Sequence, residues 1–91
     1  MVTKEIIFSG KVQGVYYRAS AKEVADSLGL TGRVKNLRDG RVWMIATGTE
    51  EQMERFIAWN RKGPSAARIE LLETRMATDP GYTDFRIERD N

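Results

Sequence analysis

Apolar residues recur along the chain with two periods, one typical of strands and one typical of helices. Residues Glu5 to Val12 alternate loosely, with Ile6, Phe8 and the last residue of the run on one face, and this pattern predicts a first strand. From Tyr17 onward, apolar residues recur every three or four positions, which predicts an amphipathic helix that ends at a Gly29 cap. The apolar positions of this helix are Tyr17, Ala21, Val24, Ala25 and Leu28.

The next segment predicts a β-hairpin. Two β-rich runs, Thr31 to Leu37 and Arg41 to Thr47, flank the tripeptide Arg38-Asp39-Gly40. An Asp-Gly pair between two such runs is the strongest short-range hairpin signal, because both residues tolerate the backbone angles of tight turns. We therefore expect the second and third strands to pair with each other here.

The remainder of the chain predicts one more helix and two more strands. Thr49 and Gln52 have the spacing of a capping box, so a second helix is expected after Thr49, ending at Gly63-Pro64. Ala67 to Met76 supplies a fourth strand. After a Pro-Gly turn, alternation over Thr83 to Arg89 predicts a short edge strand.

The order strand, helix, strand, strand, helix, strand predicts a ferredoxin-like α+β fold. In this arrangement, an antiparallel sheet is covered on one face by two helices. With 91 residues and neither repeats nor a linker, the chain is expected to form a single domain over residues 1–91. The fold alone does not decide the function, because it hosts enzymes, metal carriers and RNA-binding domains.

The segment between the first strand and the first helix has the features of an anion site. The first N–H groups of a helix are normally satisfied by a Ser, Thr, Asp or Asn cap, and residues 14–17 offer none of these. Arg18 follows in the first turn, where a cation opposes the helix dipole by about 0.3 to 1 kcal/mol. A bound anion would satisfy the N–H groups and the guanidinium together, and Gly10 and Gly14 would let the backbone approach it. An ordinary surface arginine is the alternative.

The composition restricts the chemistry that such a site can perform. The chain contains no His and no Cys, which excludes a histidine base, a serine triad, a thiolate nucleophile, a disulfide framework and nearly all zinc sites. Catalysis by positioning and charge alone needs a leaving group that departs without a proton, as a carboxylate with a pKa of about 4 does. Acyl phosphates meet this requirement, whereas a phosphate ester would need an acid or a metal ion. We expect neither a metal nor a cofactor.

Charge and hydropathy are consistent with a small soluble protein. The formal net charge of +2 suits a small anionic ligand and is too modest to argue for nucleic acid by itself. The N-terminus lacks the pattern of a signal peptide, and no stretch approaches the length of a membrane span. We expect a cytoplasmic monomer that does not associate with membranes.

Two strings resemble the two signatures of the acylphosphatase family. GKVQGVYYR, residues 10–18, is similar to the first signature, and GRVKNLRDGRV, residues 32–42, followed by Gly48, is similar to the second. Two signatures in this order and separation are far more specific than one glycine loop, and the resemblance extends over nearly the whole chain. Arg33 departs from the pattern, because the family usually has an aromatic residue there. The catalytic positions still match the family pattern. The departure at Arg33 is expected to affect local packing or substrate preference.

The resemblance implies an enzyme that hydrolyses the carboxyl-phosphate bond of acyl phosphates and releases inorganic phosphate. It implies that backbone N–H groups cradle the phosphate, that Arg18 holds two phosphate oxygens with its planar fork, and that Asn36 orients the attacking water. Arg18 and Asn36 are thus the implied catalytic residues. The implied phosphate-binding residues are Gln13, Gly14, Val15, Tyr16, Tyr17 and Arg18.

Some of these side chains have a second interpretation. Tyr17 begins the apolar face of the first helix, so its side chain is expected in the core, while Val15 and Tyr16 are expected beside the acyl group. Asn36 lies in a predicted strand, where asparagine is depleted because it competes for backbone hydrogen bonds. Without the resemblance, a polar hairpin residue and a ligand-binding residue explain it equally well. The glutamates of the second helix, Glu50, Glu51 and Glu54, are expected to form a solvated face.

The alternative function is a non-catalytic phosphate- or RNA-binding module with the same fold. Four cations make the second hairpin basic, and Trp43 adds an aromatic ring near it. An RNA-recognition domain would carry two or three exposed aromatics on its central strands, and the string RVWMIATG has one, which disfavours nucleic acid. The four cations are Arg33, Lys35, Arg38 and Arg41.

Overall fold

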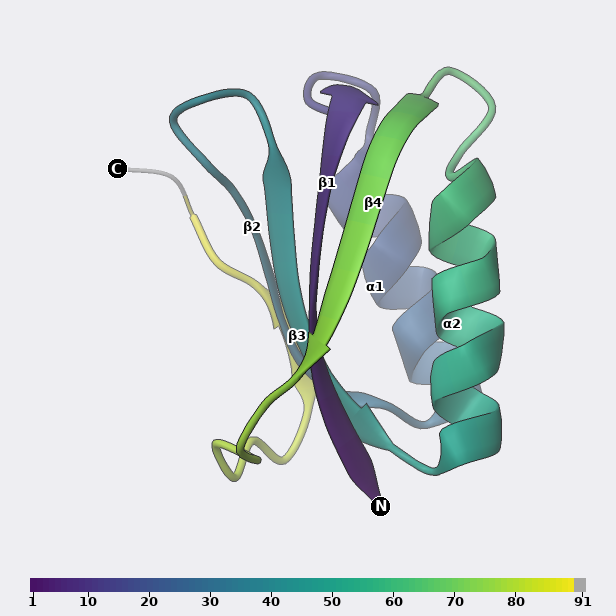
Figure 1. Ribbon diagram of the computed structural model, residues 1–91, viewed down its shortest axis with the longest axis vertical. Helices are drawn as coiled ribbons and strands as arrows, with labels where there is room; N and C mark the ends of the chain where they lie inside the picture. Colours follow the sequence, from purple (N-terminus) through teal and green to yellow (C-terminus); the bar gives the residue numbers. More distant parts are fainter. Residues whose placement is uncertain (90–91) are drawn as a thin grey trace.

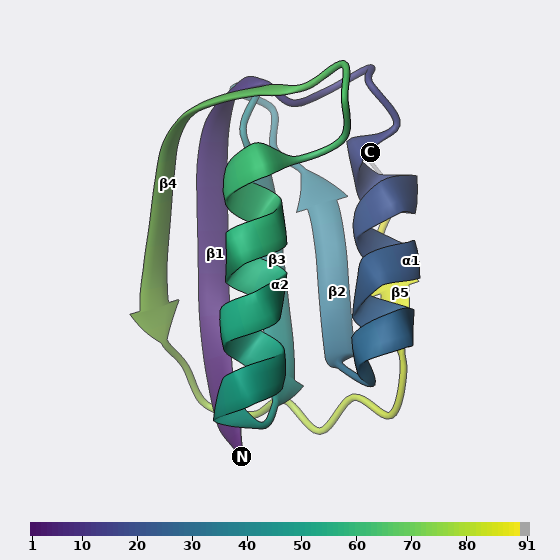
Figure 2. The same ribbon diagram turned by 90° about the vertical axis from the view of Figure 1, so that its right-hand side faces the viewer.

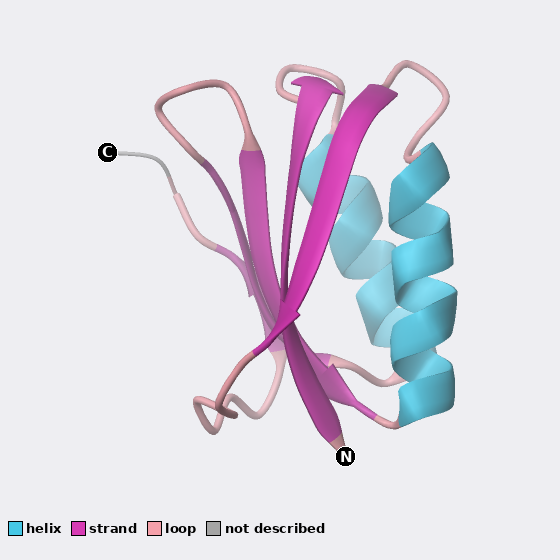
Figure 3. Ribbon diagram, in the orientation of Figure 1, coloured by secondary structure: helices cyan, strands magenta, loops and turns pink. Residues whose placement is uncertain are grey.

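The elements follow the order that the sequence predicts. The structure is a computed structural model that describes residues 1–89, and Figure 3 distinguishes its helices, strands and loops. Both helices and all of the predicted strands are present, with boundaries close to those expected. The elements are β1 (Val2–Lys11), α1 (Tyr17–Leu28), β2 (Thr31–Asn36), β3 (Val42–Gly48), α2 (Glu50–Lys62), β4 (Arg68–Met76) and β5 (Phe85–Ile87).

The strands form one sheet in the order β4-β1-β3-β2-β5. β1 pairs antiparallel with β3 and β4, and β2 pairs antiparallel with β3, as expected. The antiparallel prediction does not extend to β5, which lies parallel to β2, so that the sheet is mixed. After β4, the chain passes one end of the sheet and enters β5 from the end at which β2 begins (Figure 2), and this route makes the two strands parallel.

Both helices cover the same face of the sheet, and the core lies between the two layers (Figures 1 and 2). Ile6 and Phe8 of β1, Met44 of β3 and Phe56 of α2 are almost completely buried there. Gly29 caps α1 with a φ of 80°, and Thr49 and Gln52 form the predicted capping box of α2. The α+β arrangement of two helices on one face of a sheet is therefore confirmed.

Tyr17 fixes the start of α1 in this core. Its ring packs against Phe8 and Trp59, with ring centroids 4.6 and 5.5 Å away. Its hydroxyl lies 2.9 Å from the backbone carbonyl oxygen and 2.8 Å from the side-chain oxygen of Asn60, which is itself fully buried. Burial raises the pKa of the Tyr17 hydroxyl, so it stays protonated and remains a donor. The first turn of α1 is thus attached to α2 directly beside the loop that precedes it.

The other face of the sheet carries the hairpin tryptophan. Trp43 donates a 2.8 Å hydrogen bond from its indole nitrogen to Glu5, and the ammonium group of Lys35 lies 4.9 Å from the centre of its ring.

The three glutamates of α2 are exposed, as predicted. Within residues 1–89, neither helix has the length and apolar character that a membrane span requires.

Candidate active site

The loop before α1 leaves the helix start without a side-chain cap. Tyr16 occupies the cap position with φ 59° and ψ 26°, in the left-handed region, and no side chain there accepts a hydrogen bond. Among the hydrogen bonds between described residues, none is donated by the backbone N–H of Gly14, Val15 or Tyr16. These donors and the positive end of the helix dipole therefore suit an anion.

The two glycines of the loop have different roles. Gly14 has a φ of 74°, and a Cβ built on it would meet nothing within 4 Å, so its backbone faces open space. Gly10, in contrast, packs against β4: a Cβ there would lie 2.1 Å from the carbonyl oxygen of Arg68. Gly14 thus has the open space that the approach of a ligand would need, whereas Gly10 permits a close strand contact at the bulge between β1 and β4.

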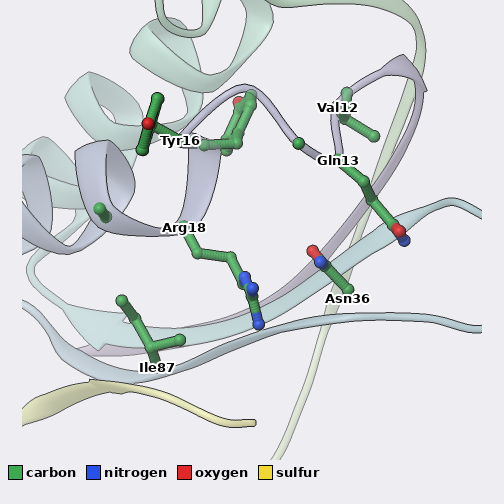
Figure 4. Close-up of a pocket in the computed structure, with 9 residues that line it drawn as sticks. Val12, Gln13, Tyr16, Arg18, Asn36 and Ile87 are labelled. Atoms are coloured by element: carbon green, nitrogen blue, oxygen red, sulfur yellow. The ribbon is translucent and has the colours of Figure 1, made fainter. Parts of the chain in front are cut away.

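The candidate site is an open pocket between this loop, the first turn of α1 and the ends of β2 and β5. Its volume is about 410 Å³. Arg18 enters it from α1, and one guanidinium nitrogen lies 3.4 Å from the carbonyl oxygen of Glu88. Asn36 enters from the end of β2 (Figure 4). The pocket is lined by Val12, Gln13, Gly14, Tyr16, Tyr17, Arg18, Ala19, Asn36 and Ile87.

The strand register explains why Asn36 lies in this pocket. Side chains two residues apart share one face of a strand, and Val34 is fully buried under the helices. Asn36 continues that face at the last position of β2, beyond the hydrophobic core and beside the start of α1. The structure thus brings Arg18 and Asn36, which lie 18 positions apart in the chain, into one pocket.

The side chain of Gln13 has a function that the sequence did not reveal. Its amide nitrogen donates to the carbonyl oxygens of Leu37 and Arg41, at 2.8 and 2.9 Å. Leu37 directly follows Asn36, so Gln13 connects the loop to the hairpin that carries Asn36. Its two acceptors lie 24 and 28 residues away in the chain, and no local pattern indicates such partners.

The hairpin turn is held by its own hydrogen bonds. Asp39 accepts from the backbone N–H of Arg41 at 3.1 Å and from its guanidinium at 2.8 Å. The backbone hydrogen bond and the Arg41 cation hold the pKa of Asp39 below its ordinary value, so its carboxylate stays ionised near neutral pH. The N–H of Leu37 donates to the carbonyl oxygen of Arg41 and closes the turn.

The two residues expected beside the acyl group have different surroundings. Tyr16 is 86% exposed and lines the pocket. The side chain of Val15 instead belongs to the hydrophobic core, with 7% exposure, and does not line the pocket. Because Val15 turns its side chain inward, its contribution to the site is limited to its backbone.

Arg33, the position that departs from the family pattern, lies outside the pocket lining. Its guanidinium carbon lies 3.8 Å from the centre of the Tyr82 ring, and its nitrogen binds the backbone and side-chain oxygens of Asp84, both at 3.1 Å. Arg86 and Arg33 together hold the pKa of Asp84 below its ordinary value. The departure therefore concerns the packing of the segment before β5 onto β2.

A second hollow adjoins the pocket on the hairpin side. It has a volume of about 440 Å³ and shares Gln13 and Asn36 with the first pocket. Apart from Leu37, its remaining lining is polar and mostly basic: Lys35, Arg38, Glu88 and Arg89. Within the described part of the chain, no three Asp or Glu side chains gather closely enough to hold a metal ion.

Taken together, the fold and the site define a ferredoxin-like α+β domain with a candidate phosphate site at an uncapped helix start. The chain belongs to the acylphosphatase family, whose family profile, described as Acylphosphatase, matches residues 4–87. A curated acylphosphatase from Methylococcus capsulatus is 48% identical over 86 residues, covering 93% of this chain and 94% of that protein.

Solved structures agree with the family. The crystal structure of acylphosphatase from Bacillus subtilis has a TM-score of 0.93 and 31% identity, covering 97% of this chain and 99% of that one. An acylphosphatase from Coxiella burnetii has a TM-score of 0.92 and 34% identity, covering 96% and 92% of the two chains. The fold thus matches along almost the entire length of both proteins.

Proposed function

We propose that this protein is an acylphosphatase that hydrolyses the carboxyl-phosphate bond of small acyl phosphates. The observation that carries the proposal is the meeting of three groups in one pocket: the uncapped start of α1, Arg18 and Asn36. Membership of the acylphosphatase family supports the same activity.

The phosphoryl group would lie on the backbone N–H groups of residues 13–17, with the Arg18 guanidinium binding two of its oxygens. Backbone donors and a planar guanidinium directed at the phosphoryl oxygens would stabilise the charge that develops on them. The side chain of Tyr17 would take no part, since it is buried against α2.

Asn36 would orient the attacking water with its side-chain amide, which both accepts and donates hydrogen bonds. The water oxygen forms a bond to phosphorus while the bond between phosphorus and the acyl oxygen breaks. The electron pair of the broken bond leaves on the carboxylate, and the water proton passes to a phosphate oxygen. No general acid is required, because a carboxylate is a stable leaving group near neutral pH.

The same proposal covers the setting of the reaction. The chain would act as a single domain over residues 1–91, as a cytoplasmic monomer that needs neither a metal nor a cofactor. Its partners would be the acyl phosphate substrate and inorganic phosphate, without nucleic acid or membrane. The absence of His and Cys supports only the part of the proposal that concerns the metal, because it removes the usual zinc ligands and leaves the site to rely on positioning and charge.

A pair of matched substrates tests the proposed activity. Benzoyl phosphate should be hydrolysed at a rate proportional to protein concentration, and phenyl phosphate, which has the same ring and a much poorer leaving group, should not. Turnover of neither compound, together with binding of inorganic phosphate, would favour the non-catalytic phosphate-binding module. Equal turnover of both would contradict a mechanism without an acid or a metal ion.

A further inference from the structure

One side of the candidate pocket is apolar although it is open to solvent. Tyr16 is 86% exposed and Ile87 is 37% exposed, and both line the pocket together with Ala19 on the first turn of α1. Large apolar side chains are exposed at only five positions among residues 1–89, and two of the five meet here. We call Tyr16, Ala19 and Ile87 the apolar rim.

The topology of the sheet places Ile87 in the rim. β5 pairs with β2 so that Ile87 lies opposite Val34, and Ile87 shares the face of the buried Phe85 two residues earlier. The following residue, Glu88, donates its N–H to Val34 and accepts a hydrogen bond from Arg18 on its carbonyl oxygen. Ile87 therefore lies at the edge of the core beside Arg18.

Ile87 of the rim and Asn36 lie on different sides of Arg18. Figure 4 shows the guanidinium between the two, with Asn36 on one side and Ile87 on the other. In phosphoryl transfer, the attacking and leaving oxygens lie roughly in line through phosphorus. If Asn36 holds the water and Arg18 the phosphoryl group, the acyl oxygen must leave on the side away from Asn36, toward the rim.

We infer that the apolar rim is the acyl-binding subsite and that the protein favours acyl phosphates whose acyl group is apolar, aromatic or branched. This inference rests on the proposed function, because it takes the positions of water and phosphate from that mechanism. The acyl group would remove the exposed surface of Tyr16 and Ile87 from water. The basic hollow around Arg38 adjoins Asn36 and would lie on the water side, so it would not contact the acyl group.

The experiment compares kcat/KM for benzoyl phosphate with kcat/KM for acetyl phosphate, which differ only in the acyl group. Ile87→Thr keeps a β-branched strand residue and removes apolar surface, and it should lower the benzoyl-to-acetyl ratio by about fivefold. Tyr16→Asn should also lower the ratio, and asparagine tolerates the left-handed backbone at this position. Unchanged competitive inhibition by inorganic phosphate would verify that the cradle of the Ile87→Thr protein is intact.

Two matched controls locate the effect. Leu71→Thr removes another exposed aliphatic side chain, from β4 and outside the pocket, and Arg38→Gln removes a cation from the basic hollow. Both control variants should have the same benzoyl-to-acetyl ratio as the unmodified protein. A ratio that is unchanged in Ile87→Thr and Tyr16→Asn, or that shifts in Arg38→Gln instead, overturns the acyl subsite while leaving the hydrolase intact. Hydrolysis of neither substrate by the unmodified protein would instead overturn the proposed function.

Discussion

The side-chain amide nitrogen of Gln13 lies 2.8 Å from the carbonyl oxygen of Leu37, the residue that follows Asn36. A second hydrogen bond, of 2.9 Å, joins the same nitrogen to the carbonyl oxygen of Arg41 at the other end of the turn. One amide group therefore uses both of its hydrogens to hold the hairpin against the loop that precedes α1. This contact sets the position of Asn36 relative to the proposed phosphate cradle.

Replacing Gln13 should therefore affect catalysis more than phosphate binding. Gln13→Met keeps the size of the side chain but cannot donate, so kcat should fall by about tenfold, the equivalent of about 1.4 kcal/mol in the barrier. The inhibition constant of inorganic phosphate should change by less than about twofold. Steady-state kinetics with benzoyl phosphate and phosphate as inhibitor measure both quantities.

The second glutamine of the chain offers a matched control for Gln13. Gln52→Met removes a side chain of the α2 capping box and should lower the free energy of unfolding by about 1 kcal/mol without a comparable loss of kcat. Equal losses of kcat in the two variants would mean that Gln13 acts only through stability.

Asn36→Ala should lower kcat by roughly two to three orders of magnitude, as the loss of other preorganised hydrogen-bonding groups does. Because the proposed role of Asn36 is to hold water, phosphate affinity should change much less. The comparison of kcat with the phosphate inhibition constant separates the two effects. A variant with near-normal kcat would show that Asn36 is only a polar residue at the end of β2.

Turnover should not depend on a divalent metal ion. The proposed mechanism places the charge stabilisation on backbone N–H groups and Arg18, and the leaving carboxylate needs no Lewis acid. Hydrolysis of benzoyl phosphate should therefore survive dialysis against excess chelator. Loss of activity that magnesium or zinc restores would contradict this mechanism.

Acid should destabilise the protein partly through Glu5. Hydrogen bonds from Trp43 and Arg75 hold the pKa of Glu5 below its ordinary value of 4.5. A carboxyl group with a lowered pKa in the folded state adds stability above its unfolded pKa, and this stability is lost as the pH falls through the folded value. Between pH 7 and 5 its contribution should be constant, and the decline should begin below about pH 4.5.

Urea unfolding at a series of pH values measures the Glu5 effect. Glu5→Gln removes the ionisable group, so the free energy of unfolding should fall less steeply below pH 4.5 than in the unmodified protein. If the free energy of unfolding falls with the same slope against pH in both proteins, the acid sensitivity comes from other carboxylates. Asp39 and Asp84 are candidates, because their pKa values are also lowered.

The sequence predicted the local features of the site because they depend on neighbouring residues. The lack of a capping side chain before Arg18 and the Asp39-Gly40 turn are both visible in short strings, and the structure has both. The capping box of α2 follows from a fixed spacing in the same way. Features of this kind are determined by backbone hydrogen bonding within a few residues.

What the sequence could not predict depends on contacts between distant segments. The parallel pairing of β5 is set by the path of the preceding loop, since alternation over three residues carries no direction. Val15 turns into the core although its neighbours suggest a surface loop. The partners of Gln13 and of Arg33 are likewise fixed by the packing of hairpin and edge strand, not by local sequence.

The most direct measurement of the central claim is thermal unfolding with and without inorganic phosphate. If the loop before α1 and Arg18 bind the phosphoryl group, phosphate at a hundredfold excess over Kd should stabilise the folded protein by about 2.7 kcal/mol. Each kcal/mol corresponds to roughly 4 to 8 °C in Tm for a domain of this size. Chloride at matched ionic strength should do much less, because it only screens charges.

The decisive comparison uses three arginine variants. Arg18→Ala should abolish most of the phosphate-induced rise in Tm, and Arg18→Lys should restore little, because a point charge does not replace the bidentate fork. Arg55→Gln removes the same charge from the exposed face of α2 and should keep the full rise. If phosphate raises the Tm of Arg18→Ala as much as that of the unmodified protein, the anion binds elsewhere, and the proposed phosphate site at Arg18 is contradicted.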